Sequence, residues 1–109
     1  MKVINLLLYN KSITIKSSTR LEINELAESK TAMGIFNSLT NEIYIYEGLT
    51  DKVKEATLVH ELVHAISFLF GYGELDQENL CDFVAGHIDE LNRIVEIWRK
   101  RIMEVLNNG

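Results

Sequence analysis

The 109-residue chain contains no proline and a single cysteine, Cys81. One cysteine cannot form an internal disulfide, so a hydrophobic core must stabilise the fold, and a chain of this length can form one such core. Long apolar runs are also absent. The longest at the front, residues 3–8, is too short to span a bilayer and lacks a following small-residue cleavage site. These absences predict one cytoplasmic domain, residues 1–109, with no membrane partner.

Basic residues are scarce in the middle of the chain. The net charge is −5, and residues 51–90 hold two lysines against nine acidic residues. The only basic cluster, Arg99-Lys100-Arg101, has the composition of a solvated helix face. An acidic region suits a cation and argues against a nucleic-acid partner.

The most informative pattern that is present is His60-Glu61-Leu62-Val63-His64. On an α-helix, side chains at i and i+4 lie one turn apart on one face, so both imidazoles can hold one Zn²⁺. Glu61 points about 100° away, where it can act as general base on metal-bound water. The alternative is a buried helix that carries two histidines by chance. An apolar setting disfavours it, because two histidines and a glutamate there need a binding partner.

A catalytic zinc site needs a third protein ligand and one open position. Glu78 and Asp82 lie four residues apart in a helix that Asp76 can cap, so they share a face. Glu78 can bind the metal, and Asp82 can accept a hydrogen bond from a ligating histidine. His87 lies about half a turn from the Glu78 face and cannot join it. The alternatives are a first-turn acid favoured by the helix dipole for Glu78 and a solvated face for Asp82. The downstream candidates by residue type are Glu74, Asp76, Glu78, Asp82, His87, Asp89 and Glu90.

These two motifs together are similar to those of zincin metallopeptidases that bind zinc through two histidines and a glutamate. Over about residues 33–86 the chain resembles more closely the ImmA/IrrE-like family, small metallopeptidases common in phages and mobile elements of bacteria. Family members typically have Glu-x-x-Ala or a close relative and then Phe-Ala, whereas residues 78–85 read Glu-Asn-Leu-Cys-Asp-Phe-Val-Ala. The resemblance implies a zinc-dependent protease that cuts a protein or peptide.

The hydrophobic patterning predicts an α+β fold. The resemblance makes it a minimal zincin-like one, with a small antiparallel or mixed N-terminal sheet packed on the H-E-x-x-H helix and one or two C-terminal helices after it. The strand-rich part covers residues 1–47, the active-site helix residues 50–70, and the C-terminal helical part residues 76–107. The individual elements expected in the first part are strands at 3–8 and 12–16, a short helix at 20–30 and a hairpin of 34–36 with 42–46.

Zincin folds usually place an edge strand beside the active-site helix, where an extended substrate adds to the sheet. The strand nearest that helix in sequence is predicted to be this edge: Glu42, Ile43, Tyr44, Ile45 and Tyr46. Alternatively, its isoleucines or tyrosines simply supply the core. An oxyanion donor is also needed, and the sequence does not choose among four candidates: Tyr44, Tyr46, Tyr72 and His87.

The tail carries a heptad-like apolar seam. This helix either packs along its own domain or forms a homodimer seam through residues 81–105, and Cys81 is expected to be a small core residue within it. The seam consists of Cys81, Val84, Ile88, Leu91, Val95, Trp98, Ile102 and Val105.

Two classes of function remain. One is a zinc peptidase of phage or mobile-element origin. The other is a non-catalytic, zinc-binding regulatory module of phage origin. An intact Glu61 favours the peptidase, because a structural zinc site needs no base beside its ligands.

Overall fold

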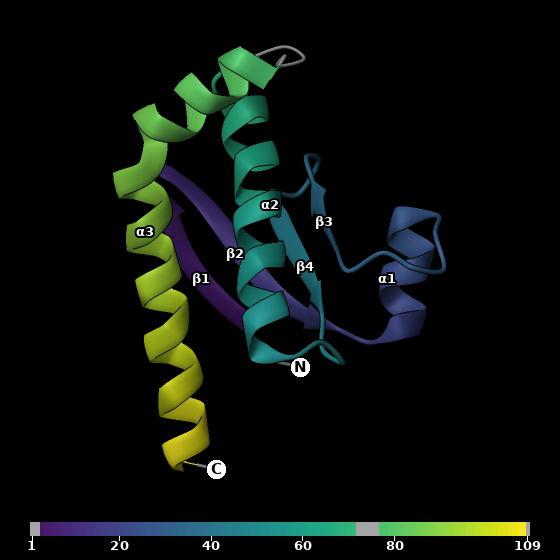
Figure 1. Cartoon of the computed structure of the whole chain (residues 1–109). Coiled ribbons are helices and arrows are strands. Elements are labelled where there is room, and N and C mark those ends of the chain that lie inside the picture. Colours follow the sequence, from purple (N-terminus) through teal and green to yellow (C-terminus); the bar gives the residue numbers. More distant parts are fainter. Residues whose placement is uncertain (1–2, 72–76, 109) are drawn as a thin grey trace.

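The computed structural model describes the backbone of residues 3–71 and 77–108, and the side chains of residues 3–71 and 79–101. The fold is α+β, as predicted, with the strands in the first half of the chain and the two long helices in the second (Figure 1). The elements in chain order are β1 (Val3–Leu8), β2 (Lys11–Ser18), α1 (Arg20–Ala27), β3 (Gly34–Asn37), β4 (Glu42–Tyr46), α2 (Asp51–Leu69) and α3 (Gln77–Asn108).

The strands form one mixed sheet in the order β1-β2-β4-β3. β1 pairs antiparallel with β2, β2 pairs parallel with β4, and β4 pairs antiparallel with β3. β4 is therefore a central strand, and the prediction that Glu42, Ile43, Tyr44, Ile45 and Tyr46 form the edge is wrong. The edge strand that contacts α2 is β3.

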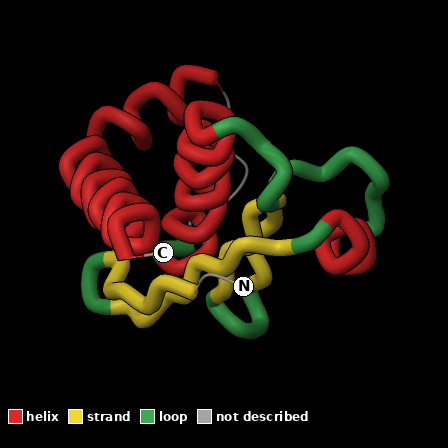
Figure 2. Tube along the Cα trace, turned by 90° about the horizontal axis from the view of Figure 1, so that it is seen from below, coloured by secondary structure: helices red, strands yellow, loops and turns green. Residues whose placement is uncertain are grey.

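Both long helices lie on the same face of the sheet, while α1 lies beside it (Figure 2). The starts of α1 and α2 are each fixed by a threonine. The Thr50 hydroxyl accepts the N–H of Val53 at the first turn of α2, and Thr19 forms a capping box with Glu22 at α1. α1 ends at Glu28, which adopts a left-handed conformation.

The core lies between the sheet and the two long helices. Alternating isoleucines of β2 and β4 face it, and α2 and α3 each contribute a stripe at helical spacing. The buried apolar residues of this cluster are Leu8, Ile13, Ile15, Ile43, Ile45, Leu58, Leu62, Ala65, Ile66, Phe83, Leu91, Ile94, Val95 and Trp98. The centre of the predicted seam, Leu91 to Trp98, is thus buried in the chain's own core, which favours the intramolecular alternative.

α3 is bent. Its first turns cross the C-terminal end of α2, and the remainder runs alongside α2 (Figure 1). Cys81, in the first part, is exposed, so the expectation that it is a core residue is wrong. Val84 is partly buried against the core, but Ile88 is 43% exposed, so the seam is interrupted before Leu91. Among the described residues, no helix has the length and hydropathy needed to cross a membrane.

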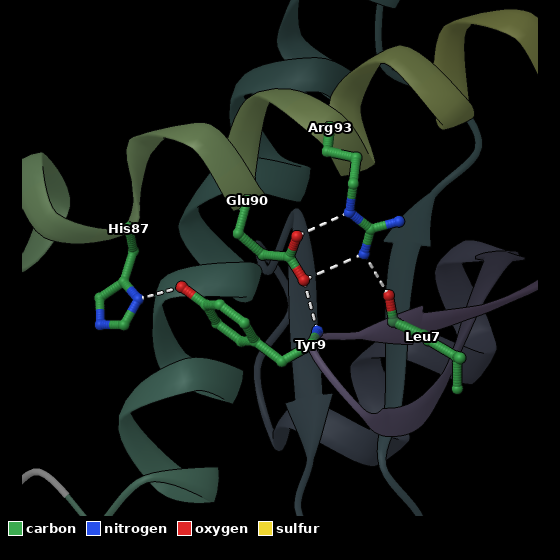
Figure 3. Close-up of polar contacts among 5 residues, drawn as sticks. All are labelled: Leu7, Tyr9, His87, Glu90 and Arg93. Atoms are coloured by element: carbon green, nitrogen blue, oxygen red, sulfur yellow. Dashed lines mark hydrogen bonds and ion pairs between the residues drawn. The ribbon is translucent and has the colours of Figure 1, made fainter.

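A polar cluster fastens the β1–β2 turn to α3 (Figure 3). Tyr9, in the turn, has a left-handed backbone with φ of 53°, and its N–H donates to the Glu90 carboxylate. Arg93 donates to Glu90 and to the carbonyl of Leu7, while the Tyr9 hydroxyl contacts His87 Nδ1. The charged pair therefore binds two backbone groups of the β1–β2 hairpin.

Candidate functional site

His60 and His64 project from one face of α2, as predicted. Their Nε2 atoms are 3.2 Å apart, with ring centroids 4.9 Å apart and planes at 71°. Two ligands at about 2.0–2.1 Å from a tetrahedral zinc would be about 3.3–3.4 Å apart. The observed spacing fits a shared metal ion, although one N–H···N hydrogen bond between the rings has the same length. The side chain of His60 is 68% exposed, so its nitrogen is accessible.

Glu61, in contrast to the exposed His60, is buried. Its side chain is 8% exposed, and Oε1 lies 3.8 Å from His60 Nε2. Burial raises the pKa of Glu61, while the two nearby histidines and a hydrogen bond from the Phe36 backbone lower it by smaller amounts. Desolvation makes a carboxylate a stronger proton acceptor. The structure thus places a buried carboxylate of raised pKa beside the histidine pair.

Gly34 lets β3 approach α2 closely. A Cβ at this position would lie 2.6 Å from Thr57 Cγ2 and 3.2 Å from Glu61 Cγ, so only glycine fits without movement. The close packing of β3 on α2, which forms one wall of the site, was not predicted from the sequence. The available signal was a glycine beginning a short apolar strand, which often marks close approach of another segment.

The register of β3 shows which of its main-chain groups point away from β4. Tyr46 N–H donates to the carbonyl of Met33 at 2.8 Å, and bonded pairs alternate along an antiparallel ladder. Ile35 therefore bonds to Tyr44, while Gly34 and Phe36 turn their N–H and C=O groups away from β4. The Phe36 N–H is the group that bonds to Glu61. The main-chain groups of Gly34 remain directed to the edge.

A cleft runs between β3 and α2, with a cavity on each side of Glu61. The cavity on the His64 side has a volume of about 420 Å³, and the one on the His60 side about 340 Å³. Gly34 and Glu61 line both, so the carboxylate lies at their junction. The first is lined by Gly34, Ile35, Phe36, Ser38, Glu61, His64 and Phe68, the second by Met33, Gly34, Val53, Ala56, Thr57, His60 and Glu61.

The remaining predicted site residues are not brought to this cleft or cannot be placed. The side chain of Glu78 and all of Tyr72 lie outside the described residues, although the backbone of Glu78 is in the first turn of α3. Asp82 is exposed. Within the described part of the chain, no three His, Cys, Asp or Glu side chains are grouped to hold a metal.

His87 and the two strand tyrosines also lie apart from the cleft. His87 contacts Tyr9 and packs near Phe70, a residue that follows α2 and lines neither cavity. Tyr44 donates its hydroxyl to Glu42 at 2.8 Å, and Tyr46 packs under the Arg20 guanidinium. None of these three predicted oxyanion donors lines either cavity.

Comparison of the chain with protein-family models, curated proteins and solved structures gives no match. The assignment of a function therefore depends on the geometry of the site.

Proposed function

We propose that the chain is a zinc-dependent peptidase of the zincin type, acting as a regulatory protease of phage or mobile-element origin. The observation that carries the proposal is the position of Glu61. Its buried carboxylate lies beside two exposed histidines at metal-sharing distance and at the junction of two cavities. A carboxylate in a cleft beside two histidines that can share a metal is an arrangement that metal-assisted hydrolysis uses.

The metal would be held by His60 and His64, with Glu78 as the proposed third ligand. Bound zinc would supply a Lewis acid that polarises a peptide carbonyl and lowers the pKa of water. Glu61 accepts the proton of the attacking water and then donates it to the leaving amine. The hydrogen bond from the Phe36 backbone and the packing against Gly34 hold this carboxylate in one orientation.

The open edge of β3 fits the same function. An extended peptide adds to a sheet through main-chain hydrogen bonds. The outward N–H and C=O of Gly34 supply one such pair directly beside Glu61. A peptide bound there would lie along the cleft and pass both cavities.

The proposal is tested by separating metal binding from catalysis. Purified protein is expected to bind one zinc per chain by elemental analysis after reconstitution, and His60→Ala or His64→Ala should lose it. Glu61→Gln should retain the zinc and the circular dichroism spectrum of the wild type but lose cleavage of a peptide library, because it removes only the base. Absence of zinc binding by the wild type would refute the metal site.

Two further outcomes separate the peptidase from a non-catalytic zinc module. Equal cleavage by the wild type and Glu61→Gln would exclude Glu61 as the base. Zinc binding that stabilises the fold without any cleavage, across peptide and denatured-protein substrates, would favour the non-catalytic module.

A further inference from the structure

Phe68 is a large aromatic residue that the core does not use. Its side chain lies on the last turn of α2 and is 56% exposed. Its ring centroid is 6.0 Å from that of Phe36, with the planes tilted by 58°. Phe36 is partly buried against the core, whereas Phe68 is outside the core cluster. Both rings line the larger cavity, so they form an apolar wall one helical turn beyond His64.

The two cavities lie toward opposite ends of the cleft and are lined by different side chains. β3 and α2 run in the same direction along the cleft, so the starts of both elements line one cavity and their ends line the other. Met33, just before β3, shares the smaller cavity with Val53 near the start of α2. Phe36, near the end of β3, shares the larger cavity with Phe68 near the end of α2. The aromatic pair is thus confined to the His64 side of Glu61.

An extended peptide is the occupant that this cleft fits. The outward main-chain groups of Gly34 can pair with a strand, and the side chains of an added strand point alternately to the two faces of the sheet. Those on the helix-facing side would enter the cavities beside Glu61. In strand addition, main-chain bonds supply affinity and such pockets supply specificity.

We propose that Phe36 and Phe68 form a subsite that selects a large apolar, preferentially aromatic, side chain of an extended peptide, next to the bond to be cut. This inference rests on the proposed peptidase function. The aromatic rings offer the faces and edges that favour ring–ring contact, and the cavity of about 420 Å³ has room for a large side chain. The class of substrate is therefore an extended segment with a bulky apolar residue flanking the scissile bond.

Phe70 provides the matched control. It is 48% exposed, similar to Phe68, and follows it by two residues. Its ring packs instead against Tyr9, at 5.2 Å and 83°, and near His87 on α3. Phe68→Ala and Phe70→Ala therefore remove the same group from the same end of the helix, but only the first alters the cleft.

The first test is digestion of a peptide library by the zinc-reconstituted full chain. Wild type should cut with Phe, Tyr or Leu enriched at one fixed position from the bond, by about tenfold or more over Ala. Phe68→Ala should lose this enrichment, and Phe70→Ala should keep it. Cleavage without a preference for large apolar residues, or unchanged preference in Phe68→Ala, would overturn the subsite.

A binding measurement distinguishes failure of the subsite from failure of the proposed function. Fluorescence anisotropy with zinc-loaded Glu61→Gln compares two labelled peptides that differ only by Phe or Ala at one position. About tenfold tighter binding of the Phe peptide, lost when Phe68→Ala is added, supports the subsite even if wild type cleaves nothing. In that case only the peptidase activity is refuted. Equal binding of both peptides, or of neither, overturns the subsite whatever the cleavage result.

Discussion

Replacement of Gly34 by alanine tests the close packing of β3 on α2. The new methyl group would lie 2.6 Å from Thr57 Cγ2, 3.0 Å from the carbonyl oxygen of Tyr44 and 3.2 Å from Glu61 Cγ. The Tyr44 oxygen belongs to the backbone of a central strand. Thr57 is buried, and its hydroxyl donates to the carbonyl of Val53 at 2.8 Å. Neither atom can withdraw easily, so β3 must move away from α2.

The expected loss of stability follows from two opposing effects. Overpacking of a well-packed region costs about 1–3 kcal/mol. The lower conformational entropy of the unfolded alanine chain offsets about 0.4–1 kcal/mol of this. The net loss in the free energy of unfolding is therefore about 1–2 kcal/mol. Each kcal/mol lowers the Tm of a domain of about this size by about 4–8 °C.

Thermal and urea unfolding, followed by far-UV circular dichroism, measure this loss against two controls. Gly86→Ala adds a methyl group that meets nothing within 4 Å inside α3 and should stabilise the protein by about 0.5–1 kcal/mol. Adding Thr57→Ser to Gly34→Ala removes the nearest methyl group but keeps the hydroxyl, and should recover part of the loss. Wild-type stability in Gly34→Ala, or no recovery in the double variant, would refute the packing argument.

Three further predictions concern the metal, the sheet surface and the polar cluster that joins the β1–β2 turn to α3. In zinc titrations, Glu78→Ala should lose most of the affinity and Asp82→Ala about 10- to 100-fold; the reverse order would contradict the proposed ligand set. Lys16 and neighbouring hydroxyls lower the pKa of Glu42 from 4.5 to about 2, so the stability that Glu42 adds is present above pH 4.5 and is lost as the pH falls toward 2. The difference in unfolding free energy between wild type and Glu42→Gln should therefore shrink across that window in urea titrations. Arg93→Ala should lower the free energy of unfolding by about 1 kcal/mol and speed amide hydrogen exchange in the β1–β2 hairpin. Unchanged exchange would show that the polar cluster does not stabilise the hairpin.

The elements of the fold could be predicted from the sequence because their signals are local. Thr50 is a good N-cap, and α2 begins directly after it. The hairpin of β3 and β4 follows from two apolar runs separated by a polar turn, in which Asn41 adopts a left-handed backbone. The order of the strands was not predictable in this way. Closeness to α2 in sequence predicts β4 as the edge strand, yet β4 pairs in parallel with β2, a strand that precedes it by more than twenty residues.

The candidate site also has a part that local sequence signals predict and a part that depends on tertiary contacts. His60, Glu61 and His64 share a short helical segment, so helix geometry alone predicts their relative positions. The opposing wall comes from β3, and its contact with α2 depends on the absence of a side chain at Gly34. The wrong expectation for Cys81 arose from extending one helical period through a bend in α3; in the first part of that helix Phe83, and not Cys81, belongs to the core. A period in the sequence carries no information about what the helix packs against.

The main-chain groups at the two edges of the sheet have different surroundings, and this difference supports the proposed function. An exposed strand edge can pair with other chains, so proteins usually cover it or block it with charged side chains. At β1 the carbonyl of Leu7 accepts from Arg93, and the cluster around Glu90 fixes the adjoining turn against α3. At β3 the groups of Gly34 face outward, beside the buried carboxylate of Glu61. An open edge is a liability in a protein that binds nothing there, but it is a requirement in one that must align an extended peptide with a base. Under the proposed function, the β3 edge is the place where an extended peptide would pair with the sheet.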